Sequence, residues 1–202
     1  AIDAWVSLTF HSDKKQIPNF RIDPKQGYSF YWRKTEMFAG PHSVITPDFA
    51  KRTRVEQVHR IFHEDLHGAI KKNDADDESI VTALGYFATL KFFQETKDNN
   101  SVVETRHLIE DSRAYTKELL TLARRIEDLF KSGAVSRAEG RRQASEILSG
   151  SFHISWLLDQ DNQSPENALE ALVSHEFMYW KHFERLADLY EKFGNFKILL
   201  NE

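Results

Sequence analysis

The chain has 202 residues, which is enough for one domain with a substantial core. Its net charge of −4 argues against a nucleic-acid-binding protein, since such proteins usually carry a basic surplus. The composition, 41% hydrophobic and 29% charged, is typical of a globular protein, and no apolar run approaches the roughly 18–20 residues that a membrane-spanning helix needs.

Residues 1–50 differ in composition from the rest of the chain, because they hold four of its five prolines. Three short runs favour strands, at residues 4–10, 28–32 and 43–46, and the prolines between these runs break any helix. We expect this region to form a small sheet, or an extended arm with strand pieces, packed on the main domain.

From about Asp48 onward, apolar residues recur at helical spacing, which predicts a helical domain over residues 51–202. The pattern predicts helices over residues 55–70, 79–96, 102–131, 136–148 and 165–193. The helix over 79–96 is apolar on several sides and is therefore expected to be central. Ser136 and Glu139 match the capping-box pattern, and Gly194 is expected to end the last helix.

A metal-binding signature, His-Glu-Asp-Leu-His, occupies residues 63–67 and forms an HExxH motif. Four residues advance a helix by about 400°, so His63 and His67 lie on one face and can share a zinc ion. Glu64 is rotated by about 100°, where its carboxylate can accept a proton from water without binding the metal. The chain has no cysteine, so any metal must be bound by His, Asp or Glu. The pattern also occurs in helices that bind no metal.

A catalytic zinc site also needs a third protein ligand. Glu78 is the leading candidate, because it begins the next predicted helix and an antiparallel helix pair would return it to the motif. Asp74, Asp76 and Asp77 compete for this role, although acidic residues before a helix are usually caps.

Three further residues could contribute to the site. His59 extends the histidine stripe by one turn, so a site with three histidines is conceivable, although a supporting or surface role is the simpler expectation. His175 and Tyr179 lie one turn apart in the last predicted helix, where either could stabilise a developing oxyanion. The plainer interpretation is a helix face with satisfied histidines.

From about Val55 to the C-terminus, the chain resembles a family of predicted bacterial zinc aminopeptidases of gluzincin type. Residues 61–67 (IFHEDLH) are similar to the family's IFHELAH block, and residues 77–86 (DESIVTALGY) to its NESFATxVGY block. The segment 123–133 resembles the family's long charged helix, and residues 167–196 resemble its C-terminal NAxL helix. Residues 1–50 do not match the family's longer N-terminal part.

The resemblance implies a zincin-like α+β domain dominated by helices, with Glu78 as the third zinc ligand. It also implies a zinc-dependent peptide hydrolase, with a peptide or small-protein substrate and a location in the bacterial periplasm or cell envelope. Asp65 and Asp77 depart from the usual family residues, and Tyr179 stands a few positions from the family's usual tyrosine.

Two other functions fit the sequence. The first is a catalytically inactive zincin-like binding or scaffold domain that keeps the metal motif, and it is suggested by the missing match over residues 1–50. The second is a purely helical interaction module in which the histidines bind no metal.

Overall fold

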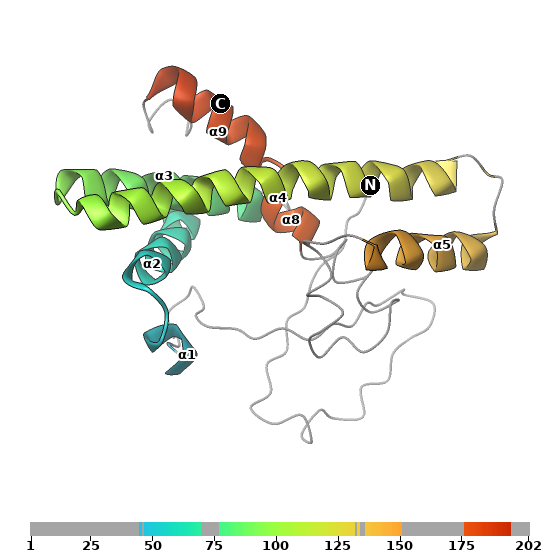
Figure 1. Cartoon of the computed structure of the whole chain (residues 1–202), viewed down its shortest axis with the longest axis horizontal. Coiled ribbons are helices and arrows are strands. Elements are labelled where there is room, and N and C mark those ends of the chain that lie inside the picture. The colour runs from blue at the N-terminus through green and yellow to red at the C-terminus, as the bar shows by residue number, and fades with distance from the viewer. Residues whose placement is uncertain are drawn as a thin grey trace.

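The computed structural model describes residues 45, 47–69, 77–131, 133, 136–150 and 176–194 (Figure 1). This part of the chain is predominantly helical, as predicted, and it contains no strand. The expected strands at 4–10 and 28–32 lie outside the described residues, and of the third only Ile45, which is exposed, is described. None of the described helices has the length and apolar character needed to cross a membrane.

The described helices, in chain order, are α1 (Pro47–Ala50), α2 (Arg54–Ala69), α3 (Asp77–Glu95), α4 (Asn99–Lys131), α5 (Arg137–Ser149), α8 (Phe177–Trp180) and α9 (Phe183–Phe193). Helix α3 is central, as its sequence predicted, since it packs against α2, α4, α8 and α9. The longer α4 runs beside α3 and continues past it to pack on α5 (Figure 1).

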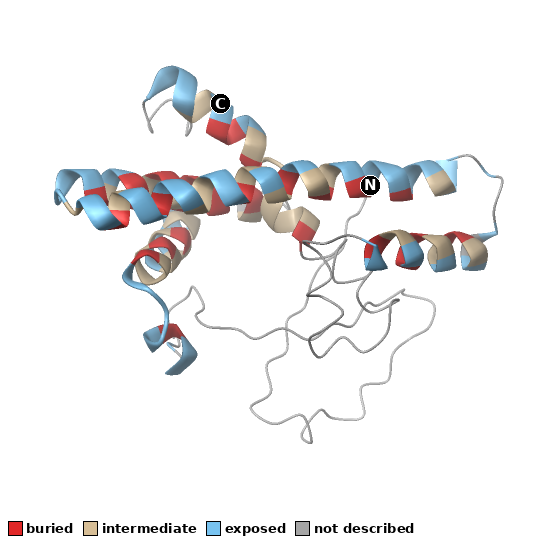
Figure 2. Cartoon of the chain, in the orientation of Figure 1, coloured by how far each residue is buried: buried red, intermediate tan, exposed pale blue. Residues whose placement is uncertain are grey.

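Buried residues concentrate where the helices face one another (Figure 2). One cluster joins α3 to α9 through Ala83, Leu84, Phe87, Phe183, Leu186 and Ala187. A second joins α4 to α5 through Leu119, Leu122, Ile126, Ala144 and Leu148. Leu66, which lies within the HExxH segment, packs against the first cluster, while the second lies on the C-terminal half of α4.

Local signals explain where two of the helices begin. Thr53 and Glu56 form a reciprocal capping box at the start of α2. The Thr53 backbone N–H donates to the Glu56 carboxylate at 2.9 Å, and the Glu56 backbone N–H donates to the Thr53 hydroxyl at 3.2 Å. Ser136 caps α5 by accepting a hydrogen bond from the Glu139 N–H, as predicted. The Glu139 carboxylate instead accepts bonds from Arg142 and Gln143, so only half of that box forms.

The last helix is not continuous, in contrast to the single helix predicted up to residue 193. Helix α8 ends at Trp180, and α9 begins at Phe183. The backbone N–H of His182, between the two helices, donates to the Ser79 hydroxyl of α3 at 2.8 Å. Because this bond comes from a side chain distant in sequence, helical periodicity could not reveal the break.

An ion-pair cluster joins α4 to α9. Arg113 donates from Nε and Nη2 to the two carboxylate oxygens of Glu184, at 3.0 Å each. It also pairs with Asp188 and Glu191. Hydrogen bonding from Arg113, reinforced by Lys117, lowers the pKa of the Glu184 carboxyl.

This lowered pKa makes the stability of the fold depend on pH. Glu184 stabilises the folded state above the unperturbed glutamate pKa of 4.5, and this contribution is lost as the pH falls through the lower folded-state pKa. We expect Glu184→Gln to lower the free energy of unfolding at about pH 6, and the difference from wild type to shrink towards about pH 3. Urea unfolding followed by helical circular dichroism in chelator-containing buffer measures this. Glu110→Gln, at an exposed site, is the control, and a Glu184→Gln difference that is independent of pH would contradict the expectation.

Candidate metal centre

The site lies between α2 and α3, where the two helices approach closely. Gly85 of α3 permits this approach, since a Cβ there would meet the His59 ring and the His63 backbone nitrogen at 3.3–3.4 Å. Because His59 is itself buried, the ring has little room to move away. The absence of a side chain at residue 85 therefore sets the distance between the helix that carries the motif and its neighbour.

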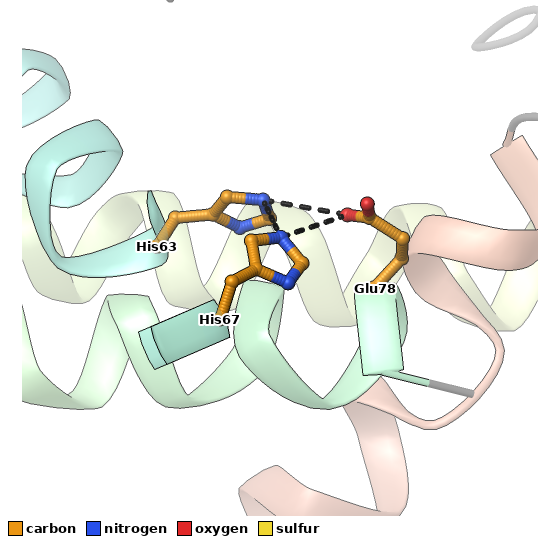
Figure 3. A group of neighbouring side chains, drawn as sticks. All are labelled: His63, His67 and Glu78. Carbon is orange, nitrogen blue, oxygen red and sulfur yellow. Dashed lines mark hydrogen bonds and ion pairs between the residues drawn. The ribbon is translucent and has the colours of Figure 1, made fainter. Parts of the chain in front are cut away.

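His63 and His67 of α2 and Glu78 of α3 turn towards a common point (Figure 3). The Nε2 atoms of the two histidines are 3.3 Å apart. Glu78 Oε2 lies 3.4 Å from the Nε2 of His63 and 3.5 Å from that of His67. The motif and the first turn of the next helix thus bring together the three residues singled out from the sequence as metal ligands.

This triangle has the size that a tetrahedral zinc site requires. Ligand atoms about 2.0–2.1 Å from zinc at tetrahedral angles lie roughly 3.3–3.4 Å from one another. Glu78 Oε2 is also buried without a hydrogen bond of good geometry from the described residues. Such an orphaned oxygen beside two imidazole nitrogens is costly unless a proton or a cation sits between them. The three residues therefore fit a zinc ion in both spacing and chemistry.

The charge state of Glu78 also favours a cation. Burial alone would raise the pKa of the Glu78 carboxyl, but the neighbouring His63 and His67 imidazoles outweigh this effect. The pKa of Glu78 consequently lies well below its ordinary value, and the group is a carboxylate at neutral pH.

The centre has a closed side and an open side. The His63 side chain is 3% exposed, whereas those of His67 and Glu78 are 25% and 26% exposed. A catalytic zinc site keeps one position for water or substrate, whereas a structural site is enclosed by four protein ligands. Among the residues that the structure describes, three candidate ligands with one accessible side match the catalytic pattern.

Glu64 lies next to this group without belonging to it. Its half-buried carboxyl interacts electrostatically with both histidines and with Glu78. Burial raises the pKa of Glu64 above its ordinary value, although the nearby histidines oppose the shift. A raised pKa suits a group that must take up a proton and release it again.

His59 does not join the three converging residues. Its ring is buried and stacks on Tyr86 with 3.8 Å between ring centroids, and its Nε2 lies 3.5 Å from the Thr82 carbonyl oxygen. Burial lowers the pKa of His59 to about 3, so the imidazole is neutral at physiological pH. His59 therefore supports the site from one turn away, and a centre with three histidines is not what the structure forms.

The other sequence candidates are placed only in part. Tyr179 of α8 stacks its ring on His63, with centroids 6.0 Å apart and planes at 8°. His175, Asp74 and Asp76 lie outside the described residues, as does the side chain of Asp77.

Thr82 is a neighbour of the site that motif analysis missed. Its hydroxyl oxygen lies 3.4 Å from His63 Nδ1, the ring nitrogen that faces away from Glu78. A signal was nevertheless present, because Thr82 follows Glu78 by four residues and shares its face of the helix.

A separate groove of about 750 Å³ lies between α4 and α5. Its lining includes Lys117, Leu122, Arg125 and Ile147, and no residue of α2 or α3 takes part. The groove is therefore distinct from the candidate metal centre.

Comparisons of this chain with models of protein families, with curated proteins and with solved structures gave no match. The resemblance to gluzincin-type aminopeptidases stays a prediction, and the geometry and chemistry of the centre carry the functional argument.

Proposed function

We propose that this protein is a zinc-dependent peptide hydrolase. The observation that supports the proposal is the convergence of His63 Nε2, His67 Nε2 and Glu78 Oε2 at 3.3–3.5 Å from one another, with Glu64 between the two histidines in sequence. The zincin-like fold and cleavage from the amino end of the peptide are part of the same proposal, and both derive from the family resemblance.

Each residue has a distinct role in this mechanism. His63, His67 and Glu78 would hold the metal. A zinc ion bound there would act as a Lewis acid towards a carbonyl group and lower the pKa of water to about 7. The Glu64 carboxylate would accept the proton of the attacking water and pass it to the leaving amine. The raised pKa of Glu64 helps it to hold that proton between the two steps.

Tyr179 is the residue of α8 that we place at the substrate side of the centre. Its ring lies parallel to that of His63. We propose that its hydroxyl donates to the carbonyl oxygen of the peptide as negative charge develops there.

The test is metal content and peptide hydrolysis in protein purified without a metal-affinity step. We expect one equivalent of zinc per chain, and hydrolysis of a mixed peptide library that stops with chelator and returns with zinc. Bound zinc without hydrolysis of any peptide would instead favour the inactive scaffold domain. A chain that takes up no metal, even after reconstitution, would favour the helical interaction module.

Glu78→Gln tests the ligand from the second helix. The substitution keeps the shape of the side chain but removes the charge that two imidazoles and a cation would share. We expect zinc affinity to fall by more than the roughly 10–100-fold that losing a supporting hydrogen-bond partner costs. Competition with a chelating dye measures this, and Glu95→Gln, at an exposed position of the same helix, should leave the affinity unchanged. Equal affinity in Glu78→Gln and wild type would remove Glu78 from the ligand set.

A further inference from the structure

We infer that Thr82 is a positioning residue that fixes the tautomer and orientation of His63, a role that rests on the proposed metal site. His63 can present a lone pair from Nε2 only if its ring proton is on Nδ1. That proton then needs an acceptor. The Thr82 hydroxyl oxygen lies 3.4 Å from Nδ1 and can fill this role.

Burial increases the energetic importance of the contact between His63 Nδ1 and the Thr82 hydroxyl. His63 and Thr82 are each 3% exposed, so solvent reaches this nitrogen poorly. A buried N–H without a partner costs free energy, and the opposite tautomer would place the proton on Nε2, where the ligand lone pair is needed. When the Thr82 hydroxyl accepts a hydrogen bond from Nδ1–H, the His63 tautomer that can bind metal through Nε2 also has its N–H donor satisfied. The separation is long for a hydrogen bond, and we expect it to shorten when a metal fixes the ring.

Thr82 is itself held in place from two sides. As a β-branched residue in the middle of α3, it has few rotamers available. Its carbonyl oxygen lies 3.5 Å from Nε2 of His59, one turn before His63 on α2. His63 and His59 of α2 thus contact the side chain and the backbone of Thr82, respectively, while Gly85 leaves the room that His59 occupies. This arrangement fixes where the hydroxyl sits relative to His63.

Thr89 offers a matched comparison within the same helix. It is fully buried, and its hydroxyl donates to the Gly85 carbonyl at 2.7 Å, a bond within α3. Thr82→Val and Thr89→Val each replace a buried hydroxyl of α3 by a methyl group of similar size. Only the first removes the acceptor opposite a histidine nitrogen.

The experiment compares zinc affinity and the cobalt absorption spectrum of Thr82→Val, Thr82→Ser and Thr89→Val with those of the full wild-type chain. We expect Thr82→Val to weaken zinc binding about 10–100-fold and to change the cobalt spectrum. Thr82→Ser should recover most of the affinity, and Thr89→Val should match wild type. Thr82→Val with wild-type affinity and spectrum would overturn the inference, as would an equal loss in Thr89→Val.

A measurement on the wild-type chain keeps the inference testable even if Thr82→Val does not fold. Long-range nitrogen–proton NMR of the zinc-loaded protein reports which His63 nitrogen carries the proton. We expect protonated Nδ1, and protonated Nε2 would overturn the inference. A wild-type chain that takes up neither zinc nor cobalt would overturn the metal site and this role together. Metal binding with these variant effects but without peptide hydrolysis would overturn only the hydrolase proposal.

Discussion

Glu64→Gln is expected to leave zinc binding intact and to lower peptide hydrolysis by about 10²–10⁴-fold, the usual contribution of a general base. Glutamine has nearly the same shape but cannot accept a proton at neutral pH. The Glu64 carboxyl interacts electrostatically with His63, His67 and Glu78, but it is not one of the three converging side chains. Zinc stoichiometry and kcat/KM on one peptide, measured on the same preparation, test both halves of the expectation.

The adjacent acidic residue provides the control. Asp65→Asn makes the same change of charge at an exposed position one residue further along α2. We expect this variant to keep both zinc and activity. Full activity in Glu64→Gln would show that another group moves the proton, and loss of zinc from Glu64→Gln would place this carboxylate among the ligands.

Removing zinc should lower the thermal stability of the wild-type protein, and His63→Ala should abolish this dependence. A ligand at 100 times its Kd stabilises the folded state by about 2.7 kcal/mol. For a chain of this size that corresponds to a shift in Tm of roughly 5–10 °C. Thermal unfolding with excess zinc and with chelator, followed by circular dichroism, gives the shift for each variant.

A histidine outside the centre provides the comparison for this experiment. His107 on α4 is largely exposed and faces Glu110. His107→Ala should therefore show the same zinc-dependent shift as wild type. A zinc-dependent shift that survives in His63→Ala would indicate that the stabilising ion binds elsewhere on the chain.

Most of the helices, and the proximity of His63, His67 and Glu78, could be predicted because both follow from local rules. A 3.6-residue repeat places His63 and His67 on one face, and the short connection to α3 limits where Glu78 can lie. Gly194 ends α9 in a left-handed conformation with φ of 59°, as expected from its residue type. These features can be predicted from residues that are close to one another in the sequence.

Features that depend on contacts between distant segments were missed. Helix α4 buries Ser101, Thr105, Ser112 and Thr116. The hydroxyls of Thr105 and Thr116 donate to the carbonyl oxygens of Ser101 and Ser112 in the same helix. Hydropathy assigns such residues to the surface. Conversely, Phe130, a large apolar residue of the same helix, is 44% exposed. The break between α8 and α9 and the contact of Thr82 with His63 likewise have no counterpart in local periodicity.

The buried side of α2 consists of Val55, His59 and His63. Two of these three buried residues are thus histidines, the same groups that supply or support the candidate ligands. A substitution such as His63→Leu would place an apolar side chain at this buried position and simultaneously remove a candidate ligand. Selection for a tighter interface and selection for a working centre therefore act in opposite directions on this helix, which is the usual form of a trade-off between stability and activity.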